Sequence, residues 1–164
     1  MTRAAVLREQ SSTTGIGQFA AIQTVAPIGL ELSTVDLRDA GEIERAVAAF
    51  SQVPNGGLIV TASQFGGNHP DLIAAVATRY KLPAVYPFRY FVSAGGLISY
   101  GPDLESDYRT ASGYVDRILK GEKAANLPVQ APTKYELAIN LKTSKALGIN
   151  VPATLLARAD AVIE

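Results

Sequence analysis

The sequence contains no cysteine and a single histidine in 164 residues. Without cysteine the chain has no disulfide, no thiolate metal site and no cysteine nucleophile. One histidine also rules out the groups of imidazole ligands that most transition-metal centres use. We therefore expect neither a metal nor a cofactor, and much enzyme chemistry is excluded.

The chain also has little charge and no excess of either sign. Fifteen Lys and Arg balance fifteen Asp and Glu, and charged residues make up only 18% of the sequence. The basic residues are scattered, so the electrostatic footprint of a nucleic-acid or anionic-membrane binder is missing. We expect a small-molecule partner and no nucleic acid.

Long apolar runs are absent as well. The longest, at residues 58–60 and 82–88, are strand-sized and far below the roughly 18 residues that span a bilayer. Residues 1–10 hold a short apolar piece followed at once by Arg8 and Glu9, which is not the apolar region of a signal peptide. Taken as given, the chain is expected to be soluble and cytoplasmic.

Hydrophobic residues nevertheless make up 48% of the chain, enough for the core of one ordinary domain. Apolar runs and breakers alternate in the first half. They predict strands at 4–7, 30–37, 58–62 and 83–88, with helices at 16–26, 42–50 and 72–80 between them. Pro27 is the expected stop of the first helix, and residues 63–68 are expected to be a loop. This order predicts an α/β fold, a parallel sheet flanked by helices on both faces.

The regular alternation of apolar runs and helix or strand breakers ends after residue 88. A glycine-punctuated apolar stretch at 91–102 predicts an extended crossing segment. Asp103 precedes a helix expected at 104–119, whose apolar residues share one face and which Gly121 ends. The rest predicts a strand at 135–140, a short helix at 143–147 and a final helix at 152–163.

Ligands of open parallel sheets bind outside the carboxyl ends of the strands. The loops that follow the predicted strands are rich in hydroxyls, amides and, at 86–90, aromatic rings. That mixture suits a small polar or aromatic organic ligand. The glycine loop at 14–17 lacks both phosphate-binding fingerprints, and Ser63 lacks the GxSxG context of a hydrolase nucleophile. His69 fits a helix start better than a general base, while the aromatic run fits core and ligand contact equally well.

Several motifs in the second half resemble a known family. They are Leu97-Ile98-Ser99-Tyr100-Gly101, Ile118-Leu119-Lys120-Gly121-Glu122-Lys123, Leu127-Pro128-Val129-Gln130, Tyr135-Glu136-Leu137-Ala138-Ile139-Asn140 and Leu155-Leu156-Ala157-Arg158-Ala159-Asp160. In this order they are similar to the C-terminal half of the tryptophan/tyrosine-type substrate-binding proteins of ABC transporters. The resemblance covers nearly the whole chain and is most specific from residue 83 to 164.

The resemblance implies a periplasmic-binding-protein type I-like lobe of Rossmann-like topology, with a crossing segment from the second lobe. Residues 1–89 plus 149–164 would form the ligand-binding lobe, and 90–148 the crossover segment and the remainder of the other lobe. It also implies a periplasmic protein of about twice this length that closes on a solute and serves an ABC transporter permease. The chain would then be a truncated form.

The family's ligand contacts lie at strand ends and crossing segments. Carried over residue by residue, they fall on Ser11, Ser12, Thr13, Thr61, Ser63, Tyr86, Phe88, Tyr100 and Asp103. The loop at 63–65 departs from the acidic or amide loop of aromatic-amino-acid binders, which leaves the ligand class open. The implied function is non-enzymatic binding of a small organic solute, amino-acid-like or aromatic.

The crossing segment would expose an apolar face in this chain, formed by Tyr108, Val115, Ile118 and Leu137. Since large apolar patches are normally covered, we expect a homodimer through residues 92–140. Two other hypotheses stay open at this stage. One is a cytoplasmic flavodoxin-like enzyme or regulatory domain that binds a phosphorylated ligand at the 11–17 loop. The other is a truncated product that dimerises without serving transport.

Overall fold

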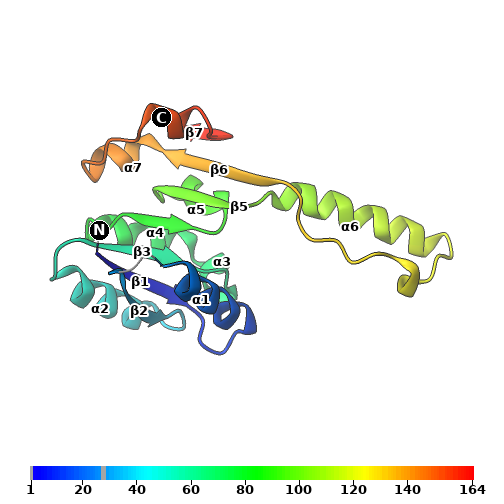
Figure 1. Cartoon of the computed structure of the whole chain (residues 1–164), viewed down its shortest axis with the longest axis horizontal. Coiled ribbons are helices and arrows are strands. Elements are labelled where there is room, and N and C mark those ends of the chain that lie inside the picture. The colour runs from blue at the N-terminus through cyan, green and yellow to red at the C-terminus, as the bar shows by residue number, and fades with distance from the viewer. Residues whose placement is uncertain (1, 27–28) are drawn as a thin grey trace.

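We describe the chain from a computed structural model, which covers residues 2–26 and 29–164. A single sheet runs through the body of the molecule, and one long arm projects from it (Figure 1). The predicted helix stop at Pro27 lies outside the described residues.

The sheet has seven strands in the order β2-β1-β3-β4-β5-β6-β7. They are β1 (Arg3–Arg8), β2 (Glu31–Asp36), β3 (Gly56–Val60), β4 (Ala84–Tyr86), β5 (Ile98–Pro102), β6 (Tyr135–Asn140) and β7 (Ala161–Ile163). Strands β1 to β5 pair in parallel, β6 is antiparallel to β5, and β7 is parallel to β6. The predicted parallel α/β sheet is confirmed.

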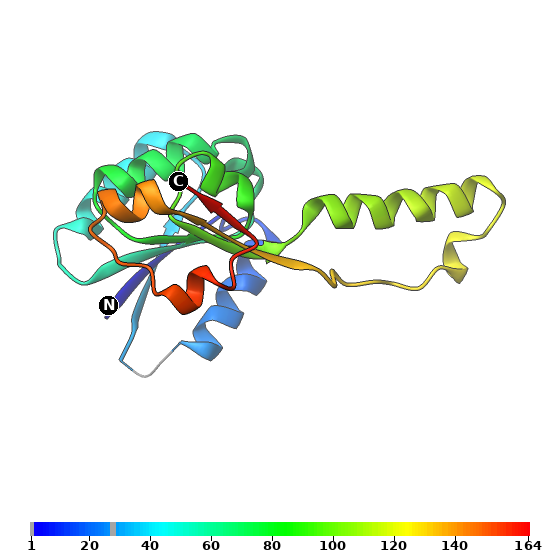
Figure 2. The ribbon, with the colours of Figure 1, turned by 90° about the horizontal axis from the view of Figure 1, so that it is seen from above.

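Helices lie on both faces of this sheet, as its buried central strands require. Figure 2 shows α1 (Thr13–Val25) and the short α8 (Ala153–Leu156) on one face, and α2 (Ala40–Ser51), α4 (Pro70–Arg79) and α5 (Arg89–Ser93) on the other. Two further short helices are α3 (Gln64–Asn68) and α7 (Leu141–Ala146). Strand β1 is buried on both faces along its centre, which explains its unbroken apolar sequence.

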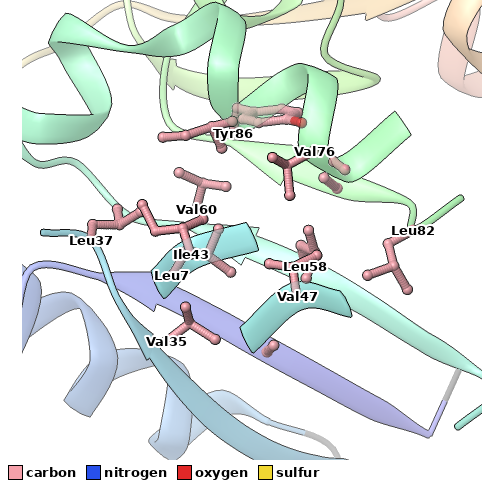
Figure 3. Close-up of a cluster of buried hydrophobic side chains, with 14 of the residues drawn as sticks. Leu7, Val35, Leu37, Ile43, Val47, Leu58, Val60, Val76, Leu82 and Tyr86 are labelled. Atoms are coloured by element: carbon pink, nitrogen blue, oxygen red, sulfur yellow. The ribbon is translucent and has the colours of Figure 1, made fainter. Parts of the chain in front are cut away.

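The core lies between the sheet and helices α2 and α4 (Figure 3). Asp39 caps α2, since its side chain accepts a hydrogen bond from the Glu42 N–H at 2.9 Å. Ile43, Val47 and Phe50 recur at helical spacing in the helix predicted at 42–50, and all three are buried against the sheet. Capping and periodicity therefore place this helix as the sequence predicts.

Three predicted elements are wrong, two of them in part. The extended segment predicted at 91–102 is confirmed only at 98–102, which forms β5, whereas Phe91 and Val92 lie in helix α5, where they are buried against the sheet. The helix ends at Gly95, whose φ of +102° favours glycine, and there the Gly96 N–H donates to the Phe91 carbonyl oxygen at 2.8 Å. Tertiary packing of two bulky apolar residues outweighs their preference for extended backbone.

The other two errors lie in a loop and at the C-terminal end. The expected loop at 63–68 forms helix α3, because the Ser63 hydroxyl accepts a hydrogen bond from the Gly66 N–H at 3.0 Å. The expected helix at 152–163 ends after Leu156. Strand β7 follows instead, held to β6 by a 2.8 Å hydrogen bond from the Asp160 N–H to the Leu137 carbonyl oxygen.

The arm comprises residues 103–134 and contains helix α6 (Leu104–Leu119), the 3₁₀ turn η1 (Ala124–Asn126) and an extended return to β6. Helix α6 matches its predicted bounds, and no residue in it is buried. Figure 2 shows the arm standing clear of the sheet and its helices. Because β5 and β6 both belong to the sheet, strands from both predicted lobes share it, and the lobe boundaries stay a prediction.

Candidate functional site

The candidate site is the carboxyl edge of the sheet, where the parallel strands β1, β3, β4 and β5 end. The arm leaves the sheet at this same edge, since it follows β5 and returns into β6. Ends of parallel strands bring loops from distant parts of a chain together. All nine predicted site residues belong to these loops or to the strand ends beside them.

Near β1, the predicted site residues are serines and threonines, and two of them stabilise the local backbone through hydrogen bonds. The Thr61 Oγ1 and N–H both donate to the Leu7 carbonyl oxygen, at 3.1 and 3.0 Å, which ties β3 to β1. Ser63 caps α3. Ser12 occupies the N-cap position of α1 without a side-chain hydrogen bond to the helix, and Ser11 and Thr13 beside it are exposed. Their hydroxyls are thus accessible at the start of α1.

On the β4 and β5 side the predicted residues are mostly aromatic. Tyr86 is buried and stacks on Phe91 with ring centroids 5.1 Å apart, and burial raises the pKa of its hydroxyl. Phe88 stacks on Tyr90 at 5.4 Å. Tyr100 is 62% exposed on the opposite face of the sheet and stacks on Tyr135 at 5.8 Å. The aromatic run therefore divides into core and accessible rings.

Two cavities join predicted residues from different strands. A cavity of about 300 Å³ brings Thr61, Tyr86 and Tyr100 together with Gln18 and Val85. A second, of about 270 Å³, holds Phe88 and Asp103 at the root of the arm, beside Arg89 and Glu136. Neither contains Ser11, Ser12, Thr13 or Ser63. The structure thus groups five of the nine positions into two neighbouring hollows.

A third cavity contains residues that the sequence did not single out. It measures about 260 Å³ and is lined by Glu9, Leu37, Arg38, Gln64, Phe65, Asn68 and His69. The Gln64 N–H donates to the Glu9 carboxylate at 3.3 Å, and the His69 and Phe65 rings lie 4.5 Å apart. These residues lie in loops that follow the strands, as the predicted site residues do. The rule that ligands bind at strand ends therefore includes them, whereas residue type alone does not identify them.

A larger groove than these three lies elsewhere, along the arm. It measures about 570 Å³ and runs between α6 and the returning chain at 130–133. The Tyr114 hydroxyl closes its outer end by donating to the Pro128 carbonyl oxygen at 2.5 Å. One helix and one extended segment form it, whereas the carboxyl edge gathers side chains from four strands, so the edge is the stronger candidate for a ligand site.

Asp103 stabilises the root of the arm, and its two carboxylate oxygens make different contacts. Oδ1 accepts hydrogen bonds from the N–H groups of Glu105 and Ser106, at 3.0 and 3.2 Å, and so caps α6. Oδ2 pairs with the Lys134 ammonium at 2.7 Å. The hydrogen bond from Lys134, followed by the capping bond from Ser106, lowers the pKa of Asp103, and the same pair raises the pKa of Lys134.

We expect acid to loosen the root of the arm. Because the pKa of Asp103 is lowered below 3.8 in the folded chain, its stabilising contribution is present above that value and is lost as the pH falls through the lowered pKa. The protection factors of the amides in the first turn of α6, which correct the exchange rates for their intrinsic pH dependence, should fall at the acid end when they are followed from neutral pH to about pH 2.

Two variants separate the ion pair from the cap. Asp103→Asn keeps a capping oxygen but has no carboxylate to titrate, so its protection factors should not show the acid-dependent fall. Lys134→Met removes the ion pair and Lys134→Arg retains it. A wild-type acid response in Asp103→Asn would show that another group controls the root.

Two searches of the described residues bear on other functions. Across residues 2–26 and 29–164, no three His, Asp or Glu side chains gather into a group that could hold a metal ion. Within the same residues, every helix is too short or too polar to cross a membrane.

The chain is similar to known proteins at the level of family and fold. The family model described as ABC transporter substrate binding protein matches residues 9–163. No curated protein matches the chain.

Among solved structures, a conserved domain protein from Vibrio cholerae superposes with a TM-score of 0.88 at 20% identity, covering 98% of this chain and 54% of that one. An ABC domain from Streptococcus pneumonia in complex with L-Trp superposes at 0.86 with 23% identity, covering 99% and 56%. A ligand-free, open substrate binding protein with adhesive properties from Clostridium difficile gives 0.70 at 19% identity, covering 99% and 54%. The chain therefore spans about half the length of each.

Proposed function

Since the chain belongs to the ABC transporter substrate-binding protein family, we propose that it binds a small organic solute, amino-acid-like or aromatic, and does not transform it. The carboxyl edge of the sheet is the proposed binding surface. The solved neighbour that holds L-Trp supports an aromatic amino acid as the class of ligand to test first.

The observation that carries this proposal is the cavity around Thr61, Tyr86 and Tyr100. All its lining residues are uncharged, and it combines the exposed ring of Tyr100 with the hydroxyl of Thr61 and the amide of Gln18, while the ring of Tyr86 packs on the other face of the sheet. Such a lining suits an aromatic or apolar side chain, with a few polar groups to orient it. Charged groups lie nearby, at the arm root, where Arg89 and Asp103 face the second cavity.

The alternative of a phosphorylated ligand has less support. The 11–17 loop has no Lys or Arg, and the family match points to solute binding instead. A phosphate at the start of α1 would depend on backbone donors and the helix dipole alone.

We further propose the cellular setting that the family implies. The protein would act outside the cytoplasm, in the periplasm or its equivalent, and would deliver its solute to an ABC transporter permease. The family match supports both, since solute capture for transport is what members of such a family do.

We also propose that two copies of the chain form a homodimer through residues 92–140. The support is the apolar face of α6, on which Tyr108, Val115 and Ile118 are exposed. Leu137, expected on the same face, instead lies in β6 and is half-buried in the sheet, so it does not extend the apolar face of the helix. The pairing surface proposed for the dimer therefore centres on the arm.

Calorimetric titration with L-tryptophan, L-tyrosine and L-leucine tests solute binding. Tyr100→Ala should weaken binding of an aromatic amino acid about fivefold, because an aromatic contact contributes about 1 kcal/mol. Val162→Ala is the control: it removes an exposed apolar side chain from β7, two strands away from Tyr100. Equal affinities in both variants, or no heat with any amino acid, would refute the proposed site.

A further inference from the structure

We infer that the cavity of about 260 Å³ around His69 binds a small zwitterion, the charged head group of an α-amino acid. In this arrangement the Glu9 carboxylate receives the ammonium group, and the Arg38 guanidinium receives the carboxylate group. The inference rests on the proposed function and narrows it, because it requires the solute to carry both charges together.

Three neighbouring strands of the sheet bring the walls of this cavity together. Strands β2, β1 and β3 lie side by side in that order. Glu9 is the first residue after β1, and Arg38 is the second residue after β2. The remaining lining comes from the same loops and from the chain after β3, namely Leu37, Gln64, Phe65, Asn68 and His69. The cavity is therefore built without any residue of the arm.

Hydrogen bonds hold both charged side chains but use only part of each. Glu9 accepts a hydrogen bond from the Gln64 N–H through Oε2, at 3.3 Å. Arg38 pairs with Asp36 through Nε, and the other Asp36 oxygen accepts a hydrogen bond from the Gln10 N–H at 3.1 Å. Within residues 2–26 and 29–164, Glu9 Oε1 and the two terminal nitrogens of Arg38 have no such partner. These atoms are available to a solute.

The charges in the lining select a solute that carries one charge of each sign. Apart from His69, Glu9 and Arg38 are the ionisable residues of the cavity lining. An amine without a carboxylate would lie beside the Arg38 guanidinium, and an acid without an ammonium group would lie beside the Glu9 carboxylate. Contacts between like charges lower affinity and exclude wrong ligands. A phosphate group would likewise be repelled by Glu9.

Uncharged side chains complete the cavity. Leu37 is fully buried, and Phe65 packs against the hydrophobic core, so these two form an apolar floor. The amides of Gln64 and Asn68 are exposed and supply neutral donors and acceptors at the rim. An apolar surface with a few polar groups is typical of sites for small ligands. The cavity can therefore hold a head group together with the first carbon atoms of a side chain.

NMR spectroscopy of the full chain provides a direct test, because His69 is its single histidine and lines this cavity. Glycine is the probe, since it is the head group without a side chain. At constant pH and ionic strength, glycine should shift the imidazole proton resonances of His69 in a saturable manner. Methylamine and acetate, which each carry one of the two charges, should not. No shift with glycine, or equal shifts with all three probes, would overturn the inference.

Variants that remove one charge test each half of the site. Arg38→Gln and Glu9→Gln should each raise the dissociation constant for glycine about tenfold, the contribution of a charged hydrogen bond. Glu9→Gln keeps an oxygen for the Gln64 N–H. The controls are Arg45→Gln on α2 and Glu31→Gln at the amino end of β2, which are exposed, lie outside the cavity and should change nothing. Unchanged dissociation constants in both cavity variants would overturn the inference.

A comparison with Tyr100→Ala separates this inference from the proposed function. Tyr100 lines a different cavity, so its loss should weaken binding of L-tryptophan but leave the glycine response of His69 unchanged. If L-tryptophan binds and glycine leaves His69 unaffected, the head-group site is wrong while solute binding stands. If glycine binds and no amino acid gives heat through Tyr100, the head-group site stands and the cavity around Tyr100 is refuted.

Discussion

Gly101→Ala should destabilise the lobe more than any other small substitution at the site. A Cβ at this position would lie 1.8 Å from the Pro87 carbonyl oxygen and 2.9 Å from its carbonyl carbon. Both atoms belong to the backbone at the end of β4, so no side-chain rotation relieves the clash and the two strands must separate. We expect a loss of about 3 kcal/mol in the free energy of unfolding, measured by urea denaturation.

Gly113→Ala is the matched control. This glycine lies within α6, and a Cβ there meets nothing within 4 Å. Alanine should stabilise the helix by about 0.5–1 kcal/mol, since glycine loses more backbone entropy on folding. If the two substitutions had equal effects, the close approach between β5 and the chain after β4 would not be a feature of the folded protein.

Phe91→Ala has the second large effect. This side chain is 1% exposed and stacks on both Tyr86 and Tyr90, with ring centroids 5.1 and 4.8 Å away. Its removal leaves a cavity between α5 and the sheet, and we expect a loss of about 3–5 kcal/mol in the free energy of unfolding. Thermal and urea unfolding followed by circular dichroism provide the measurement.

Tyr100→Ala provides the comparison, because it also removes an aromatic ring but from an exposed position. It should change the free energy of unfolding by less than about 1 kcal/mol while reducing affinity for an aromatic solute. The two variants thus separate rings that build the fold from rings that are available to a ligand. A stable Phe91→Ala protein would contradict the packing described for α5.

The strands and the long helices could be predicted because local rules agree with tertiary structure there. Helix α2 has an Asp39 cap and a three-residue apolar stripe, and both serve in the structure as the sequence indicates. Strand β6 has the predicted bounds. Two of the three failures share a cause: α5 and β7 are short apolar segments whose conformation depends on the strand that they contact, which periodicity within one segment does not report.

For the site, the strand-end rule selects one edge of the sheet but does not say which side chains are accessible there. Tyr86 and Tyr100 have the same residue type, yet one is buried under α5 and the other is exposed on the opposite face. The difference follows from where each faces in the sheet and from which face α5 covers. Contact of these residues with a solute stays a prediction until titration tests it.

The β5–β6 pair carries one more consequence, for evolution and engineering. Pro102 and Tyr135 are register partners in adjacent antiparallel strands, so the chain leaves the sheet and re-enters it at the same place. The chain between Pro102 and Tyr135 thus connects β5 to β6 as one long hairpin loop, and a short turn would connect the two strands equally well. Residues 103–134 are therefore a removable module. Selection can change their length and sequence to suit whatever the arm contacts without altering the topology of the sheet.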